Sequence, residues 1–179
     1  MDKNIEVENK IFAIIVSFNP SKEELEALLR AAAPQVDGML VIDNGSSSDI
    51  ASFIPARHAE KVSCLLLNDN LGVAAALNRG IAWAEKLGAT HVVLFDQDSV
   101  PDAGMIEALL ATHQELNLNG NRVASVGPCF FDDRLENPAP FIQVRGGRVK
   151  RLTCACNDKI ATVDYLVTSG SLISMKTFA

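Results

Sequence analysis

A chain of 179 residues, 48% of them hydrophobic and 21% charged, has the size and composition of one globular domain. Its formal charge of −6 argues against a nucleic-acid-binding protein, because neutralising many phosphates requires clustered Lys and Arg. A nucleotide ligand stays open, since a metal ion and backbone N–H groups are enough for a few phosphates. No apolar run suggests a signal peptide or reaches the ~20 residues of a membrane span, and we expect a cytoplasmic protein.

Short apolar runs alternate with helical periodicity from residue 11 onward, which predicts an α/β fold with a mostly parallel sheet. The first three apolar runs predict strands over 11–18, 39–43 and 61–67. Between the first two, Ser21 and Glu24 match a capping box at the start of a helix over 21–33.

The second half of the pattern begins with an Ala-rich segment that predicts a helix over 71–88, closed by Gly88. Further along, the sequence predicts a strand over 91–96, a helix over 102–117, a strand over 122–128 and a strand-like segment over 162–175. Within the polar stretch before that last segment, Gly146-Gly147 predicts a hairpin turn.

The stretch LFDQDSV places Asp96 and Asp98 at the end of an apolar strand. Because residues two apart in a strand share a face, we expect the two carboxylates to converge while Gln97 faces away. Two such carboxylates repel unless a cation lies between them. Mg²⁺ is held by one or two carboxylates plus substrate phosphates, and Mn²⁺ accepts the same ligands. The alternative is that Asp98 or Ser99 simply caps the following helix.

Three other predicted strand ends are also polar: SFNP after the first, DNGSSS after the second and NDNLG after the third. Each alone is explained by a core aromatic residue, a polar turn or a helix start. In open α/β sheets, however, ligands bind beyond the carboxyl ends of the strands. Four polar strand ends on one edge therefore favour a nucleotide lying across that edge.

The series VSFNP, VIDNGSSS, NDNLGVAAALNRGI and FDQDS, in this order, resembles the family 2 glycosyltransferases of the GT-A fold, a Rossmann-like architecture. FDQDS with TSGSLIS downstream resembles the bacterial rhamnosyltransferases of that family. The resemblance runs from about residue 11 to the end of the chain. It implies a polysaccharide-biosynthesis enzyme of the cell envelope that uses a nucleotide-diphosphate sugar, dTDP-L-rhamnose for the rhamnosyl branch, and a glycan or lipid-linked acceptor.

The resemblance also implies roles for individual residues. Phe18 would stack on the pyrimidine, Asp43 would accept the ring N–H, Asp96 would face the ribose and the metal, and Asp98 would bind the metal, Mg²⁺ or Mn²⁺. The remaining residues implied in nucleotide-sugar binding are Ser17, Asn19, Asn44, Asn70, Gly72 and Gln97. Family members of this type invert the anomeric centre in one displacement.

A single inverting displacement requires a general base. In the family this base lies in a motif that follows the TSGSLIS-like strand, so we expect it beyond Ala179 and leave the catalytic base of this chain unassigned. We therefore expect a fragment that holds the donor site without the base. The alternative function is a non-catalytic or inactive nucleotide-sugar-binding fragment. By region, we predict a polar tail over 1–10, a donor-binding part over 11–128 and the start of an acceptor-side part over 129–179.

Two other enzyme classes fit less well. Phosphatases of the haloacid dehalogenase type carry D-x-D after the first strand, whereas here it follows the fourth. Sugar nucleotidylyltransferases carry a Gly-rich loop with a basic residue after the first strand, which SFNPSKEE lacks.

The other chemistry-bearing residues have less specific interpretations. A basic patch predicts either a solvated hairpin or a contact with an anionic acceptor or with the inner face of a membrane: Arg145, Arg148, Lys150 and Arg151. We expect four reduced cysteines, because the C-x-C at Cys154 has no second pair to complete a zinc site. We read the three histidines as surface or helix-face residues that form no ligand set, and Trp83 as a packing residue.

Overall fold

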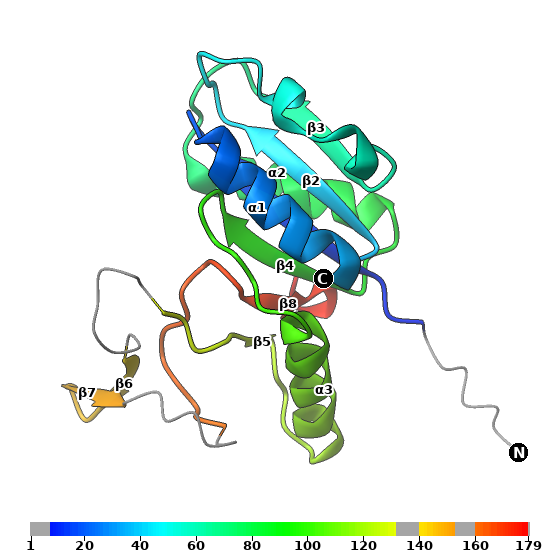
Figure 1. Ribbon diagram of the computed structural model, residues 1–179. Coiled ribbons are helices and arrows are strands. Elements are labelled where there is room, and N and C mark those ends of the chain that lie inside the picture. The colour runs from blue at the N-terminus through cyan, green and yellow to red at the C-terminus, as the bar shows by residue number, and fades with distance from the viewer. Residues whose placement is uncertain (1–7, 132–139, 153–159, 179) are drawn as a thin grey trace, which may run out of the picture.

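The structure, a computed structural model, describes residues 8–131, 140–152 and 160–178 of the chain (Figure 1). Its centre is a six-stranded sheet in the order β3-β2-β1-β4-β8-β5. Four strands are parallel neighbours: β1 (Ile11–Ser17), β2 (Gly38–Asp43), β3 (Val62–Leu66) and β4 (His91–Asp96). On the far side of β4, β8 (Leu172–Ser174) runs antiparallel to both β4 and β5 (Ser125–Val126). The predicted mixed, mostly parallel sheet is confirmed.

Helices cover both faces of this sheet, and each face has its own hydrophobic core (Figure 1). Side chains of β1 alternate between the two, so that Ala13 and Ile15 lie in one core and Phe12 and Ile14 in the other. The first core is closed by α1 (Lys22–Ala32) and α3 (Met105–Leu118), and the second by α2 (Val73–Lys86). Because β1 is buried along its whole length, its apolar run made it easy to predict.

Helix α2 lies close to β1 because residue 80 is a glycine. A Cβ atom built at Gly80 would lie 2.3 Å from Cγ2 of Ile14 and 2.9 Å from Cδ1 of Ile42. On the same face, the rings of Phe12 and Trp83 meet edge to face with centroids 5.3 Å apart. This contact confirms that Trp83 is a packing residue.

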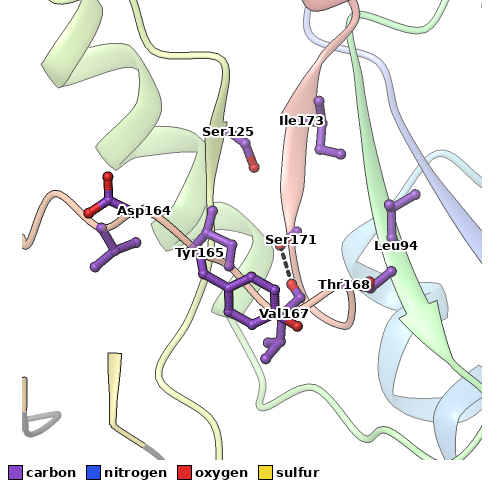
Figure 2. A pocket seen from close by; sticks show the side chains of 10 residues that line it. Leu94, Ser125, Asp164, Tyr165, Val167, Thr168, Ser171 and Ile173 are labelled. Carbon is purple, nitrogen blue, oxygen red and sulfur yellow. Dashed lines mark hydrogen bonds between the residues drawn. The ribbon is translucent and has the colours of Figure 1, made fainter. Parts of the chain in front are cut away.

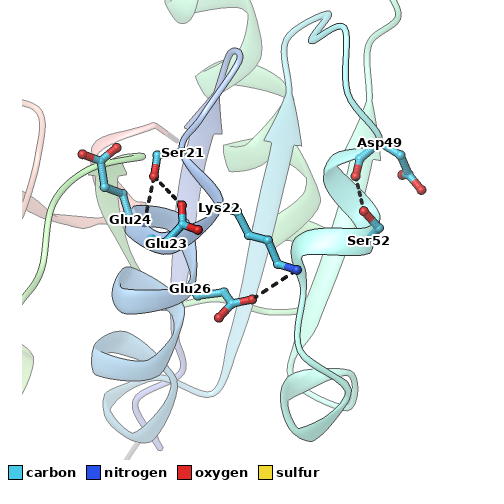
Figure 3. Close-up of polar contacts among 7 residues, drawn as sticks. All are labelled: Ser21, Lys22, Glu23, Glu24, Glu26, Asp49 and Ser52. Atoms are coloured by element: carbon cyan, nitrogen blue, oxygen red, sulfur yellow. Dashed lines mark hydrogen bonds and ion pairs between the residues drawn. The ribbon is translucent and has the colours of Figure 1, made fainter.

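The start of α1 carries half of the predicted capping box (Figure 3). The hydroxyl of Ser21 accepts a bond from the backbone N–H of Glu24 at 3.4 Å, but its own proton goes to the Glu23 carboxylate at 3.1 Å. Lys22 forms an exposed ion pair with Glu26 at 3.9 Å, an arrangement that contributes little to stability. Nearby, the hydroxyl of Ser52 donates to the backbone carbonyl of Asp49 (Figure 3).

Strands at the β5 side of the sheet are shorter than the sequence pattern predicts. β5 has two residues instead of the predicted seven, and β8 has three within the strand-like segment 162–175. β5 lies at the sheet edge with only the short β8 beside it, so few of its residues can pair.

The predicted hairpin is confirmed and forms a separate two-stranded sheet, β6 (Phe141–Arg145) with β7 (Arg148–Leu152). Gly146 and Gly147 have φ angles of 56° and 75°, and tight hairpin turns of this kind require positive φ at both central positions. On the other edge of β6, the backbone N–H of Asp164 donates to the carbonyl of Ile142 at 3.0 Å.

Two expectations about reactive side chains were wrong in part. His91 is neither a surface nor a helix-face residue: it lies in β4 and is 7% exposed. His113 lies on a helix face, as expected, but it is also 7% exposed, and its Nδ1 lies 3.3 Å from Nε2 of His91 in a hydrogen bond. His91 lies at the start of β4 and His113 lies on α3, so the fold brings together two residues that are 22 positions apart in the sequence. Of the cysteines, Cys64 is free as expected, but Cys129 is in a disulfide; Cys154 and Cys156 lie outside the described residues.

Within the described part of the chain, no helix is both long enough and apolar enough to span a membrane.

Candidate functional site

The carboxyl ends of the four parallel strands meet at one edge of the sheet, and the polar motifs of the sequence lie there. The register of the strands fixes their neighbours: Ser17 pairs with Asp43, and Val16 pairs with Asp96. Asp43 and Asp96 therefore lie on either side of the end of β1. The sheet brings together in space what the sequence separates by about fifty residues.

The two acidic residues project to opposite faces of this edge. Along β2, Val41 belongs to the core under α1 and α3, so alternation places Asp43 on that face. Along β4, Leu94 belongs to the core under α2, so Asp96 lies on the α2 face. A ligand that contacts both carboxylates must cross the edge of the sheet.

The exit from β1 is held by side chains of two other loops. The backbone N–H of Phe18 donates to Oε1 of Gln97 at 2.8 Å, and the N–H of Asn19 donates to the hydroxyl of Ser46 at 2.8 Å. The side-chain oxygen of Asn19 accepts from the N–H of Ser47 at 2.9 Å. Phe18 stays 45% exposed, which leaves it accessible to a planar ligand.

The exits from β2 and β3 are joined through two asparagines. Asn44 is 3% exposed; its Oδ1 accepts from the N–H of Leu71 at 2.9 Å and its Nδ2 donates to Oδ1 of Asn70 at 3.0 Å. The same oxygen of Asn70 accepts from the N–H of Gly72 at 3.0 Å, where the backbone has φ of 82°. In the structure these asparagines build the wall of the site.

Close approach of these two loops requires a glycine at position 45. Its φ is 91°, and a Cβ atom there would lie 2.7 Å from the backbone N of Asn70. Beside it, Asp43 is 5% exposed and accepts a bond from the N–H of Ser46 through Oδ1 at 3.0 Å. Its second carboxylate oxygen has no donor among the described residues.

The predicted strand end at Asp96 is confirmed, but the pair Asp96 and Asp98 spans a turn, so the strand alternation from which we expected the carboxylates to converge does not extend to Asp98. β4 ends at Asp96, and the N–H of Ser99 donates back to the carbonyl of Asp96 at 3.2 Å. The two carboxylates still interact electrostatically. The pKa of Asp96 is raised, first by loss of hydration and second by the negative charge of Asp98. The side-chain oxygen of Gln97 accepts from the backbone N–H of Phe18.

A loop that the sequence prediction left out of the site supports Asp96. The N–H of Asp96 donates to the hydroxyl of Ser169 at 3.2 Å, and that hydroxyl donates to the hydroxyl of Ser99 at 2.6 Å. The N–H of Gly170 donates to the carbonyl of Leu94 at 2.7 Å. The TSGS motif belongs to the family resemblance of the sequence, but only its contact with β4 shows that it orders the acidic turn.

A cavity of about 380 Å³ lies between this loop and the sheet (Figure 2). Leu94 and Ile173 form its apolar floor, and Tyr165, 61% exposed, lies across it. Within its wall the hydroxyl of Ser171 donates to the carbonyl of Val167 at 2.6 Å (Figure 2). Since Leu94 precedes Asp96 by two residues on the same face of β4, the cavity adjoins the acidic turn.

Ser17 stands apart from the other predicted site residues. It is fully buried on the face of Asp43, and its hydroxyl has no hydrogen-bond partner among the described residues. A buried hydroxyl without a partner costs free energy, roughly 1–3 kcal/mol. Like the other site residues, Ser17 lies at the carboxyl end of a parallel strand, here β1.

Asp96 and Asp98 are the residues of this edge that could hold a hard divalent cation. Burial and, second, the negative charge of Asp98 raise the pKa of Asp96, and a cation would relieve the repulsion between the two carboxylates. Among the described residues there is no group of three or more His, Cys, Asp or Glu side chains that could hold a metal. Two carboxylates without further protein ligands suit Mg²⁺ or Mn²⁺, which take their remaining ligands from water and phosphates.

The chain belongs to the glycosyl transferase family 2, whose family model matches residues 12–164. A curated relative, the dTDP-rhamnosyl transferase RfbF of Shigella flexneri, is 25% identical over 171 residues, which are 95% of this chain and 55% of the relative. The chain thus spans about half the length of that relative.

Solved structures share the fold. A crystal structure of S. aureus TarS 1-349 superposes with a TM-score of 0.60 at 15% identity, covering 93% of this chain and 47% of the other. A second S. aureus TarS structure matches 60% of this chain and 20% of its own length, with a TM-score of 0.51 and 20% identity. The α/β architecture is that of GT-A-like glycosyltransferases.

Proposed function

We propose that the protein of this chain transfers L-rhamnose from dTDP-L-rhamnose to a glycan or lipid-linked acceptor, with inversion at the anomeric carbon. The observation that carries the proposal is the arrangement of Asp43 and the Asp96–Asp98 turn at one sheet edge, on opposite faces. A nucleotide-diphosphate sugar has a base at one end and, beyond the ribose, a charged diphosphate that carries the sugar, so its base and diphosphate match this arrangement. The name of the Shigella relative supports rhamnose and dTDP.

In this proposal the exposed ring of Phe18 stacks on the pyrimidine, and the free carboxylate oxygen of Asp43 accepts its ring N–H. The wall built by Asn44 and Asn70 presents backbone groups near Gly72 to the nucleoside and phosphates. Asp96 faces the ribose. Bringing these groups together before the ligand arrives lowers the entropic cost of binding.

Asp96 and Asp98 would hold Mg²⁺ or Mn²⁺. Such an ion, when bound, neutralises the negative charge that develops on the leaving diphosphate. The residues of this chain orient the donor and hold the acidic turn in place through Ser169. We propose that the reaction takes place in the cytoplasm, as a step of polysaccharide synthesis for the cell envelope.

The test of the donor site is the melting temperature of this chain with dTDP or UDP, each with Mn²⁺ or with a chelator. A ligand at about 100 times its dissociation constant adds ~2.7 kcal/mol of stability. For a domain of this size, that corresponds to a rise of roughly 5–10 °C. We expect this rise with dTDP and Mn²⁺ and a smaller one with the chelator present.

The matched variants are Asp98→Asn at the site and Asp102→Asn, an exposed carboxylate outside it. Asp98→Asn should abolish the Mn²⁺-dependent part of the rise, and Asp102→Asn should preserve it. If dTDP fails to stabilise a folded sample, the proposed donor site is wrong. If UDP stabilises more than dTDP, the site stands but the rhamnosyl assignment fails.

A further inference from the structure

We infer that the cavity of Figure 2 binds a neutral sugar ring of the acceptor glycan, and that Tyr165 is the side chain on which this ring stacks. The inference rests on the proposed function, because it gives the acceptor of that reaction a place in the structure. The cavity has a volume of about 380 Å³, within the roughly 300–1,000 Å³ of small-molecule pockets. The residues proposed to contact the base and the metal do not line it: Phe18, Asp43, Asp96 and Asp98.

The lining of the cavity suits a neutral ligand that carries hydroxyl groups. Its apolar floor is bordered by three residues with hydroxyl side chains: Ser125, Thr168 and Ser171. The Ser171 hydroxyl donates its proton to the carbonyl of Val167 at 2.6 Å, so it can accept a bond from a ligand hydroxyl. Among the described residues that line the cavity, Asp164 has the only charged side chain, and no Lys or Arg is present to neutralise a phosphate. The lining therefore disfavours an anionic ligand and matches a sugar ring, which has apolar C–H faces and a hydroxyl-bearing edge.

Tyr165 adds an aromatic surface to this lining. It is 61% exposed and lies across the apolar floor (Figure 2). Its backbone is held against β6 by an antiparallel bridge to Ile142, and the N–H of Asp164 donates to the carbonyl of Ile142 at 3.0 Å. The N–H of Val144 donates to the Asp164 carboxylate at 2.7 Å, which ties the same segment to the hairpin. The fold thus fixes the backbone that carries the ring and leaves the ring open, and such an aromatic face packs against the C–H face of a sugar.

The loop that forms one wall of the cavity also holds the acidic turn. The Ser169 hydroxyl accepts a bond from the N–H of Asp96 at 3.2 Å, and the preceding residue, Thr168, lines the cavity. Gly170 lets this loop pack against Pro128: its φ is 81°, and a Cβ atom there would lie 2.7 Å from Cγ of Pro128. In the proposed reaction the diphosphate lies at the acidic turn, and the acceptor hydroxyl must reach the sugar that the diphosphate carries. A cavity that shares a loop with this turn is placed to present that hydroxyl.

The test is a titration of the chain with neutral sugars, followed by NMR of Tyr165. The probes are the methyl α-glycosides of L-rhamnose, D-glucose, D-galactose and N-acetyl-D-glucosamine. Because Tyr165 is the only tyrosine of the chain, ring-labelled tyrosine gives signals from this side chain alone. We expect at least one glycoside to shift these signals at up to about 50 mM, where even a dissociation constant of ~10 mM leaves most of the protein bound. The inference is overturned if none of them does.

Three variants test the role of the ring, with the affinity for the same glycoside measured by ligand-observed NMR. Tyr165→Ala should raise the dissociation constant roughly three- to tenfold because stacking is lost, and Tyr165→Phe should stay within about twofold of wild type. The control Phe178→Ala removes an aromatic side chain that is 48% exposed and outside the cavity, and it should leave the affinity unchanged. Melting temperatures confirm that each variant is folded. Wild-type affinity in Tyr165→Ala, or an equal loss in Phe178→Ala, would contradict the inference.

Two further arms separate this inference from the proposed function. Saturating dTDP-L-rhamnose with Mg²⁺ should leave the glycoside shift in place, because the donor occupies the strand ends. If the donor itself shifts the Tyr165 signals and blocks the glycoside, the cavity holds the donor sugar and the acceptor assignment is overturned. Stabilisation by dTDP without any glycoside shift overturns this inference alone. A glycoside shift without stabilisation by dTDP overturns the proposed donor site and leaves the sugar site in place.

Discussion

The buried pair His91 and His113 makes the stability of the protein depend on pH between 6.5 and about 4. His91 lies between two hydrogen bonds: its Nδ1 is 3.0 Å from the hydroxyl of Thr90, and its Nε2 is 3.3 Å from Nδ1 of His113. The other ring nitrogen of His113 donates to the carbonyl of Val123 at 2.9 Å. With both imidazoles neutral, Nδ1 of His91 can only accept, and the single hydroxyl proton of Thr90 is shared between it and the carbonyl of Lys10.

Burial lowers the pKa of His91 from 6.5 to about 4, with smaller contributions from His113 and Lys176. Below pH 6.5 the unfolded chain binds a proton at this position and the folded chain does not. Stability therefore falls as the pH drops from 6.5 towards 4, and the effect levels off below that. Since each pKa unit corresponds to 1.36 kcal/mol, the loss over this range is about 3 kcal/mol.

Urea unfolding at a series of pH values between these limits measures the effect, with His91→Gln compared with wild type. Glutamine keeps a hydrogen-bonding side chain but does not titrate, so the variant should lose less stability on acidification by about 3 kcal/mol. The control is His58→Gln, at a half-buried histidine whose pKa is lowered less, and it should change the pH dependence less. Parallel pH profiles of wild type and His91→Gln would refute the reasoning.

Three further predictions concern the acidic turn and the packing of the helices. In Asp98→Asn the pKa of Asp96 should fall but stay above that of an exposed aspartate, because burial remains; carboxyl NMR titration measures it, and an unchanged pKa would exclude coupling. Gly80→Ala should destabilise by about 1–2 kcal/mol in urea unfolding, because its Cβ would lie 2.3 Å from Ile14 and this cost outweighs the gain in helix propensity; equal or higher stability would contradict this packing. Gln35→Ala should lower the free energy of unfolding by about 1–3 kcal/mol, because the Gln35 amide joins the end of α1 to the start of α3. A loss smaller than this range in urea unfolding would mean that water replaces the bonds.

The sequence predicted the central part of the fold well because burial there is nearly complete. β1, β2 and β4 are continuous apolar runs with buried residues on both faces, whereas β3 at the sheet edge is only partly buried; each of the four begins and ends within two residues of its predicted bounds. The capping residue Ser21 likewise marked the start of α1. β5 and β8 were overestimated, because a strand's length at a sheet edge depends on how much of its neighbour pairs with it.

The candidate site was predictable only in its location. Polar strand ends identified the edge of the sheet, but hydrogen bonds between distant loops decide what each side chain does there. No local pattern shows that Asn44 binds Asn70 or that Ser169 supports Asp96. The buried histidine pair was missed for the same reason, since each residue alone has an ordinary helix or strand environment.

The bonds that tie the site together join residues far apart along the chain. Phe18 and Gln97 are separated by 79 positions, Asp96 and Ser169 by 73, and Asn44 and Asn70 by 26. The complete site therefore forms only when the strands that carry these loops are assembled in the sheet. Amide hydrogens of these loops should exchange with solvent through global unfolding once a donor is bound, and capture of a nucleotide becomes a direct readout of complete folding.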